Sequence, residues 1–461
     1  MEGLERMRKP GPGAGWTAAF AILFALTLAG PAAADVPLAA ADASKARTGK
    51  DAVRWTRVGP RKQSRMNHLH HTQEPTGMYG RYPLGRESSG TSWQPESSIH
   101  EGLHTMSGEW FTMVHAWATA VWDDQRGPRG ADDFYSANMM MARAHGPLGP
   151  GTIGFRAMFS AEPGTIGREG YPLLLQTGET ADGVTPLIDR QHPHDMVMEL
   201  ATTFSTSPGE NSSLFVYAGL PGEPALGPPV FMHRFSGEAF PDAPIGHHWL
   251  DSTHITYGVL TGGLTDGPWK LEGSMFRGRE PDQDRLDIEH PELDSHSFRL
   301  SYNANENLAV QASYGRLHSP EALEPDVDVD RTTVSVIVNS PGPGRVMQTT
   351  MAWGRNHERP GSKLDAFLLE TTTNLQLRHT LMMRIEQTEK GDLYPPGHAR
   401  AGQVFQVEKL SGGYRFDVWP RGPVAVGVGG LASLSRVPQE LETDYGGRPF
   451  GGMLYVRAEL R

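Results

Sequence analysis

The sequence predicts an all-β chain that forms a transmembrane antiparallel β-barrel of about 16 strands, within a range of roughly 14 to 18. Three observations lead to this prediction. Apolar and polar residues alternate with a period of two from Trp110 to the end of the chain. Short and long connections alternate between the predicted strands. The N-terminus carries an apolar segment of the length and flanks typical of a secretory signal peptide.

The signal peptide is predicted over residues 1–34. Arg6, Arg8 and Lys9 precede the apolar stretch 17–30, and "PAAAD" at 31–35 offers small residues for cleavage after Ala34. The stretch is too short and wrongly flanked to be a stable membrane-spanning helix. The chain has no Cys, which excludes disulfides and thiolate metal sites.

Residues 35–107 are predicted to be an irregular N-terminal extension. The segment is rich in Gly, Pro, Ser and His and shows no sustained period. It is one of the segments available to plug the barrel, which is predicted over residues 108–461.

The predicted strands alternate strictly between two kinds of side chain, which indicates two different environments on their two faces. In the stretch 152–160, for example, Ile153, Phe155, Ala157 and Phe159 share one face, and Arg156 lies on the other. The same alternation is present at 110–122, 298–303, 308–315, 332–339, 414–419 and 454–460.

The connections between strands distinguish a membrane barrel from a soluble sandwich. Seven short Gly-, Pro- or Asn-containing turns are expected, and eight longer polar loops lie between them. An even strand number places both ends of the barrel on the side of the short turns, as in outer-membrane barrels. The short turns are expected at 146–151, 207–212, 264–268, 303–307, 340–344, 374–378 and 420–423, and the long loops at 123–133, 163–194, 221–251, 279–294, 319–329, 357–362, 390–402 and 435–448.

The polar parity is expected to face the lumen, because a charge on the lipid face of a barrel costs a few kcal/mol near the midplane. A barrel of about 16 strands is too wide for its own side chains to fill. The lumen must therefore hold water or be plugged. The predicted lumen-lining residues are Arg156, Glu199, Lys270, Glu272, Arg299, Arg384, Glu386, Arg415, Asp417, Arg457 and Glu459.

Composition excludes one class of partner. The formal net charge is −11, and it becomes −12 without residues 1–34, which carry three basic and two acidic residues. Such a chain is a poor candidate for nucleic-acid binding, which depends on neutralising phosphates. The hydrophobic content of 38% is low for this length and fits a sheet with one apolar face.

The signal peptide, the alternation of turns and loops, and the last strand "MLYVRAELR" (453–461) resemble bacterial outer-membrane β-barrels of the porin type. The resemblance implies a Gram-negative outer membrane, surrounding lipid, and small solutes or metal ions as partners. Such proteins usually end in an aromatic residue that the assembly machinery reads, whereas this chain ends in Leu460 and Arg461.

Histidine clusters are the strongest chemical signal. "LIDRQHPHD" (187–195) places two imidazoles two residues apart, with Pro193 stiffening the chain between them. A second cluster lies at 231–254, and a third, "NHLHH", contains His68, His70 and His71. Imidazoles with carboxylates suit Zn²⁺, Cu²⁺, Ni²⁺ or Fe²⁺, and a Cu or Zn ion is the expected ligand. The candidate ligands are His192, His194, Asp189, Asp195, His233, His247, His248, Asp251 and His254.

Both main clusters are expected at the external mouth. The pattern at 254–259 predicts a strand that begins at His254 and turns Ile255, Tyr257 and Val259 outward. His254 would then point into the lumen. Asp195 and Glu199, at the start of the fourth strand, are expected to point into the lumen as well. The same residues could equally hold the loops in place through hydrogen bonds to the backbone.

Three functions remain open from the sequence. The first is a porin-like channel for small polar solutes or metal ions, and the second is a plugged barrel that binds a transition metal for resistance or uptake. The third is an outer-membrane lipid hydrolase, for which "DSTH" (251–254) supplies an Asp, a Ser and a His. No required cofactor and no oligomeric state is predicted. Ser252 and His254 would be about 7 Å apart on one strand face, which disfavours the enzyme.

Overall fold

The computed structural model describes residues 56–58, 75–420 and 422–461. The chain divides into two units, Met1–Val53 and Arg54–Arg461, and all described residues belong to the second. The strands of the barrel are β3 (Trp110–Arg126), β4 (Asp132–Leu148), β5 (Gly151–Phe159), β8 (Val197–Thr206), β9 (Ser212–Gly219), β10 (Val259–Asp266), β11 (Trp269–Phe276), β12 (Ser295–Asn305), β13 (Leu308–Leu317), β14 (Asp328–Asn339), β15 (Arg345–Arg359), β16 (Lys363–Leu375), β17 (His379–Lys390), β18 (Phe405–Trp419), β19 (Val424–Arg436) and β20 (Phe450–Leu460).

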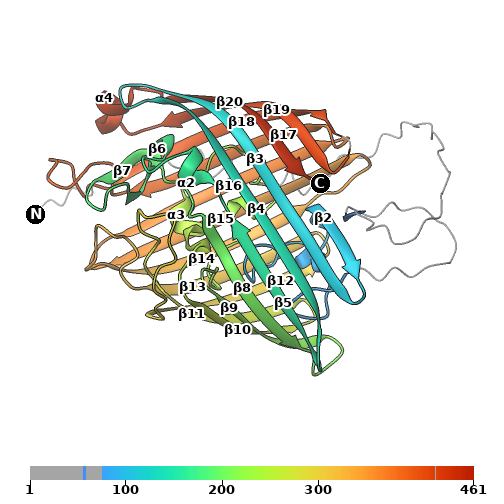
Figure 1. The fold of residues 1–461 in the computed structure, drawn as a ribbon. Helices are drawn as coiled ribbons and strands as arrows, with labels where there is room; N and C mark the ends of the chain where they lie inside the picture. Colours follow the sequence, from blue (N-terminus) through green and yellow to red (C-terminus); the bar gives the residue numbers. More distant parts are fainter. Residues whose placement is uncertain (1–55, 59–74, 421) are drawn as a thin grey trace, which may run out of the picture. The chain divides into compact units, whose positions relative to one another are not determined.

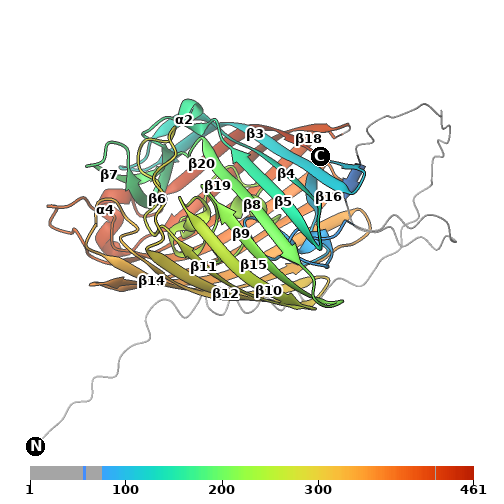
Figure 2. The same cartoon turned by 60° about the horizontal axis from the view of Figure 1, so that its bottom comes forward.

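These 16 strands form a closed antiparallel barrel, as predicted. Each strand pairs with the next one along the barrel, and β20 pairs with β3 to close the ring. Figure 1 shows the cyan β3 beside the red β20, and Figure 2 shows the same wall after rotation. Closure removes every free sheet edge within the ring, which a sheet in lipid requires.

The two faces of the strands have opposite chemistry. On β12, Phe298 is 57% exposed, whereas the neighbouring Arg299 is 1% exposed. Leu300 and Ser301 repeat the pattern, and the other strands of the ring carry exposed apolar residues in the same way. The alternation of period two in the sequence therefore becomes an apolar outer surface and a polar inner wall.

Short turns join the strands at one end of the barrel, and long loops join them at the other. The turns after β4 and β10 contain Gly149 and Gly267 at φ of +57° and +54°, a conformation that glycine adopts without strain. Figure 2 shows α4, β6 and β7 together at the loop end. The loops carry α2 (Glu162–Thr165), β6 (Tyr171–Thr180), β7 (Pro186–Gln191), η2 (Phe231–His233), α3 (His247–Leu250), η3 (Ser252–His254), η4 (Gln439–Leu441) and α4 (Glu442–Tyr445).

None of the helices in the described part of the chain is long and apolar enough to cross a membrane.

Residues 75–98, here called the lumen segment, pack against the inner wall and include η1 (Leu84–Arg86). Arg156 on β5 donates hydrogen bonds to the carbonyl oxygens of Ser88 (3.2 Å) and Gly90 (2.5 Å). Arg299 on β12 donates to the hydroxyl of Thr91 at 3.0 Å. The lumen segment therefore supplies hydrogen-bond partners to inward-facing side chains of the strands.

The loop between β9 and β10, residues 220–258, also packs against the inner wall and is here called the lumen loop. Trp249 in α3 donates a hydrogen bond to the carbonyl oxygen of Leu364 on β16 (3.0 Å). Ser236 bonds the hydroxyl of Thr350 on β15 (2.7 Å). The lumen loop, which follows β9, therefore contacts β15 and β16, strands that are not neighbours of β9 in the barrel.

Residues 35–107 were predicted to be mostly irregular, and their described part contains two short strands: β1 (Thr56–Val58) pairs with β2 (His100–Ser107), which pairs with β3. One detail of the prediction is wrong. β10 begins at Val259 rather than at His254, and Ile255, Tyr257 and Val259 are buried. The apolar residues at 255–259 pack against protein inside the barrel, so an apolar side chain there does not indicate the lipid face.

The outer surface can be tested at Leu300, in the middle of β12. Leu300→Lys is expected to destabilise the barrel by about 2–4 kcal/mol, because it places a charge in the hydrocarbon region. Urea unfolding of the protein in phosphatidylcholine bilayers measures this loss. Leu286→Lys, at an exposed position in the loop between β11 and β12, should change the free energy of unfolding by less than about 0.5 kcal/mol. Equal effects of the two substitutions would contradict the assignment of the lipid face.

Candidate metal centre

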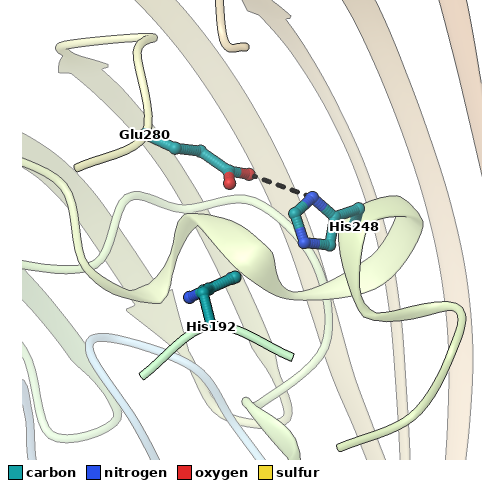
Figure 3. Close-up of side chains that lie close together, drawn as sticks. All are labelled: His192, His248 and Glu280. Atoms are coloured by element: carbon teal, nitrogen blue, oxygen red, sulfur yellow. Dashed lines mark ion pairs between the residues drawn. The ribbon is translucent and has the colours of Figure 1, made fainter. Parts of the chain in front are cut away.

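Three long loops bring His192, His248 and Glu280 together, and these residues are here called the mouth group. His192 follows β7, His248 lies in α3 of the lumen loop, and Glu280 lies between β11 and β12. One ligand atom from each lies within 4.8 Å of the other two. Figure 3 shows His248 facing Glu280, with His192 beside them on a separate segment of the chain. The three side chains are at most 9% exposed.

The mouth group contains buried polar atoms without hydrogen-bond partners. These are Nε2 of His192, Nε2 of His248 and Oε1 of Glu280. Two of the three still have an ion-pair contact, His192 with Glu179 at 3.3 Å and Glu280 with Nδ1 of His248 at 3.7 Å. A buried polar atom without a partner, such as Nε2 of His248, costs about 1–3 kcal/mol, and a bound cation would remove this penalty. Ligand atoms around a tetrahedral ion of Zn type lie about 3.3 Å apart. The three side chains would therefore move closer together when they bind an ion.

The local backbone explains how His248 reaches this position. Gly178 has a φ of +121°, and a Cβ atom at this residue would lie 2.3 Å from Cε1 of His248. Its neighbour Glu179 has a φ of +62°, which is uncommon outside glycine. Backbone conformations of this kind cluster at functional sites. Oε1 of Glu179 lies 3.3 Å from Nε2 of His192.

The mouth group continues into a row of five imidazoles. Neighbouring ring centroids in this row are 5.2–5.9 Å apart. The row connects two loops, since two of its members come from the loop between β5 and β8 and three from the lumen loop. Its order is His192, His248, His247, His254 and His194.

Three of these imidazoles are oriented through Nδ1. Nδ1 of His194 lies 2.7 Å from a carboxylate oxygen of Glu162, and Nδ1 of His247 lies 2.6 Å from a carboxylate oxygen of Asp251. Nδ1 of His254 lies 3.0 Å from the carbonyl oxygen of Asp251. An oxygen on Nδ1 leaves Nε2 as the nitrogen that can bind a metal, and this is the usual support of a metal-binding histidine.

Electrostatics favour a cation here. Burial, reinforced by His248, lowers the pKa of His192 well below its usual value, and burial with His247 does the same for the pKa of His254. Both imidazoles are therefore neutral at pH 7, the form that binds metals. For His248 burial acts in the same direction, but the carboxylates of Glu280 and Glu321 outweigh it and raise the pKa.

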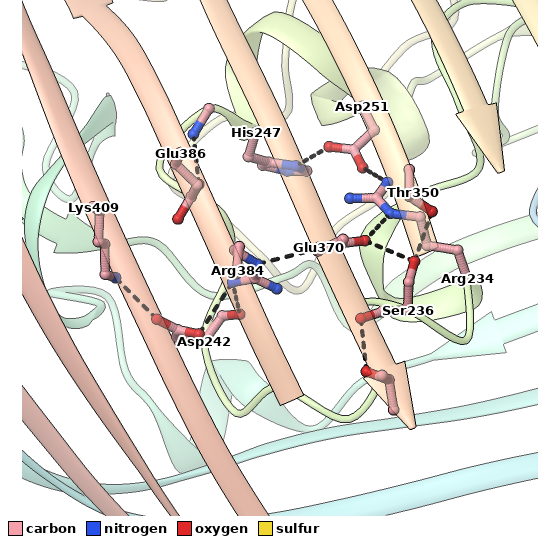
Figure 4. Close-up of polar contacts among 12 residues, drawn as sticks. Arg234, Ser236, Asp242, His247, Asp251, Thr350, Glu370, Arg384, Glu386 and Lys409 are labelled. Carbon is pink, nitrogen blue, oxygen red and sulfur yellow. Dashed lines mark hydrogen bonds and ion pairs between the residues drawn. The ribbon is translucent and has the colours of Figure 1, made fainter. Parts of the chain in front are cut away.

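A chain of ion pairs connects the inner wall with the row of imidazoles (Figure 4). The carboxylate of Glu370 on β16 pairs with Arg384 of β17 and with Arg234 of the lumen loop. Arg234 in turn pairs with Asp251, which holds His247. All members are at most 3% exposed, so each charge depends on its partners. The full order is Lys409, Asp242, Arg384, Glu370, Arg234, Asp251 and His247.

The structure separates the nine predicted ligands into groups. His192 and His248 belong to the mouth group, and His194, His247 and His254 extend it. His233 lies apart, with Nε2 3.1 Å from the sulfur of Met158. The three aspartates have other partners: Asp189 pairs with Arg129, Asp195 with Arg285, and Asp251 with Arg234 and His247.

The sequence did not single out Glu280, Glu179 or Glu162. None of them has a periodic pattern or a neighbouring histidine to mark it, and Glu280 lies among other acids of its loop. Each acid lies beside a histidine only in the folded protein, where separate parts of the chain come together.

The predicted lumen-lining residues are all at most 5% exposed in the structure. They are Arg156, Glu199, Lys270, Glu272, Arg299, Arg384, Glu386, Arg415, Asp417, Arg457 and Glu459. The predicted signal peptide (1–34) and the cluster of His68, His70 and His71 lie outside the described residues.

The geometry at Ser252 gives the hydrolase hypothesis no support. The hydroxyl of Ser252 accepts a hydrogen bond from Arg331 (3.0 Å), and Nδ1 of His254 is bonded to the carbonyl oxygen of Asp251. Asp251 directs its carboxylate to Arg234 and His247 instead. A Ser nucleophile needs a base within hydrogen-bond reach, and His254 is oriented elsewhere.

The ion pairs of Arg234 can be tested by substitution. Arg234→Leu leaves Glu370 and Asp251 with less compensation in a buried environment, and we expect a loss of about 3–5 kcal/mol in the stability of the lumen loop. Protease cleavage within residues 220–258 and urea unfolding measure it. Arg126→Leu breaks an exposed pair with Asp124 and should cost at most about 1 kcal/mol. An uncleaved lumen loop in Arg234→Leu would show that the ion pairs do not hold it.

No protein-family model matches the chain, and no curated protein matches its sequence. Solved structures with a similar fold include an anion-selective porin from Comamonas acidovorans, with a TM-score of 0.46 and 9% identity over 76% of this chain and 100% of that chain. OmpF of Salmonella typhi, in complex with daunomycin, has a TM-score of 0.45 and 10% identity over 76% and 98%.

The outer-membrane channel DcaP of Acinetobacter baumannii has a TM-score of 0.43 and 9% identity over 77% of this chain and 99% of that chain. The closed 16-strand ring and its apolar outer surface are what place this chain in a membrane. The protein is therefore a membrane-spanning 16-strand β-barrel whose fold is similar to that of these outer-membrane porins.

Proposed function

We propose that this barrel captures a transition-metal ion, Zn²⁺ or Cu²⁺, at its external mouth through His192, His248 and Glu280. The observation that carries the proposal is the convergence of three buried ligand atoms from three loops. Two imidazoles and one carboxylate suit these borderline ions. The function would be uptake or retention of metal by a porin-like barrel whose lumen is largely occupied by its own chain.

The donor set supports exchange of the ion rather than permanent storage. Sites with three protein ligands keep a fourth position open, whereas structural zinc sites are closed by four. The next imidazole of the row, His247, has its ring centroid 5.7 Å from that of His248. An ion at the mouth group would therefore have further nitrogen ligands close by, the imidazoles of His247 and His254 in the lumen loop.

The first test is calorimetric titration of the detergent-solubilised protein with Zn²⁺ and Cu²⁺. The double substitution His192→Ala and His248→Ala removes two of three ligands, and we expect affinity to fall at least about 100-fold. His379→Ala is the matched control, because His379 begins β17 at the short-turn end of the barrel, opposite the long loops that carry the mouth group. Unchanged affinity in the double variant would exclude this site.

Gly178→Ala tests the geometry without removing a ligand. The added methyl group would collide with the imidazole of His248, and the φ of +121° disfavours any residue with a side chain. We expect weaker Zn²⁺ binding with an intact barrel, measured by calorimetry and by heat-dependent migration on gels. Gly397→Ala, at an exposed loop position with a similar positive φ and no neighbour within 4 Å, should bind Zn²⁺ like the wild type.

A general channel for small polar solutes is the second candidate. The mixed charges of the inner wall favour it, but four of them, Arg156, Arg299, Glu370 and Arg384, are bonded to the lumen segment or the lumen loop. A plugged barrel is expected to show little steady conductance in planar bilayers, and the Arg234→Leu variant should open more often. Stable conductance of the wild type at the level of an open pore would favour the general channel instead.

A further inference from the structure

A second group of metal-binding side chains lies on the inner wall, apart from the mouth group. His233 ends η2 in the lumen loop, and Met158 is a buried residue on β5. Nε2 of His233 lies 3.1 Å from the sulfur of Met158. The imidazole of His115, on β3, has its ring centroid 6.3 Å from that of His233.

The short distance between nitrogen and sulfur needs an explanation. Nε2 of a neutral imidazole and the sulfur of a thioether are both electron-pair donors when Nδ1 carries the proton. Two such donors that face each other are stabilised either by a proton on Nε2 or by a cation between them. Metal bonds of about 2.0 Å to nitrogen and about 2.3 Å to sulfur place donors 3.1 Å apart at an angle of about 90°.

His115 can complete such a site. The centroid of a metal-bound imidazole lies about 3.2 Å from the ion, so two rings on opposite sides of one ion have centroids at most about 6.4 Å apart. The observed 6.3 Å is compatible with one ion between His233 and His115. Two nitrogens on opposite sides and a sulfur at a right angle form a low-coordinate arrangement, which suits a monovalent d¹⁰ ion.

The surroundings are rich in sulfur and include one buried guanidinium. Met141 pairs with both His115 and Met158 across the strands, and it belongs with Met158 to the same buried cluster. Arg156 donates to the sulfur of Met141 at 3.6 Å. A nearby guanidinium disfavours a divalent ion more than a monovalent one, because the repulsion grows with the ion's charge.

We propose that His233, Met158 and His115 form an inner site for Cu(I), which also accepts Ag(I). Thioether sulfur selects soft ions, whereas the imidazoles and carboxylate of the mouth group suit borderline divalent ions. The inner site consists of different residues and does not depend on the function proposed for the mouth group. The barrel would then hold two sites of different metal preference, one in the external loops and one on the inner wall.

The test uses the full chain in detergent with His192→Ala and His248→Ala, so that the mouth group does not contribute. Ag(I) is titrated by calorimetry, and anaerobic Cu(I) is titrated against a chromophoric chelator. Adding Met158→Leu conserves volume but removes the sulfur, and we expect affinity for Cu(I) to fall at least about 100-fold. Met453→Leu, in the same buried cluster, is the matched control and should bind Cu(I) unchanged.

X-ray absorption at the copper edge gives an independent readout. The Cu(I)-loaded protein should show nitrogen neighbours and one sulfur neighbour at about 2.3 Å, and Met158→Leu should lose the sulfur. Absence of sulfur around Cu(I) in the protein that retains Met158 overturns the proposal even if the variant does not fold. Equal Cu(I) affinity with and without Met158 overturns it as well, and the short contact is then an N–H···S hydrogen bond only. Zn²⁺ binding by protein with an intact mouth group tests the other proposal separately.

Discussion

The inner wall of this barrel carries charges that have been taken out of bulk water, and the rest of the structure depends on how they are paired. Glu370, Arg384 and Lys270 have exposed fractions of 0%. The cost of burying a charge is several kcal/mol unless hydrogen bonds and opposite charges compensate it. Neighbouring strands supply some of the partners, as Arg384 does for Glu370. A ring of 16 strands is too wide for its own side chains to meet across the lumen, so further partners come from segments inside the barrel.

Those partners are the lumen segment and the lumen loop. Arg156 and Arg299 bind the lumen segment, while Glu370 and Arg384 bind the lumen loop through Arg234 and Asp242. Because Arg234 also pairs with Asp251, and Asp251 holds His247, the wall positions one of the five imidazoles. Pairing of buried charges and placement of metal-binding nitrogens are therefore consequences of the same contacts.

The site itself could be predicted only in part. The pattern "HPH" at 192–194 and the histidines at 247–254 were visible in the sequence, and the structure brings them into one row of rings. Glu280 was not visible, because nothing in its own loop distinguishes it from other acids. The direction of Ile255, Tyr257 and Val259 was predicted wrongly, since other segments of the protein bury these apolar residues.

By itself the sequence determined the barrel: the period of two, the alternation of short and long connections, and the number of strands. These are local properties, because each strand must present an apolar face to lipid and a polar face to the lumen whatever its neighbours do. The tertiary structure alone decided which loops enter the lumen and which side chains meet there. Distances between loops depend on closure of the ring and on pairing between residues more than 100 positions apart, such as Arg234 and Glu370. No local pattern in the sequence predicts these distances.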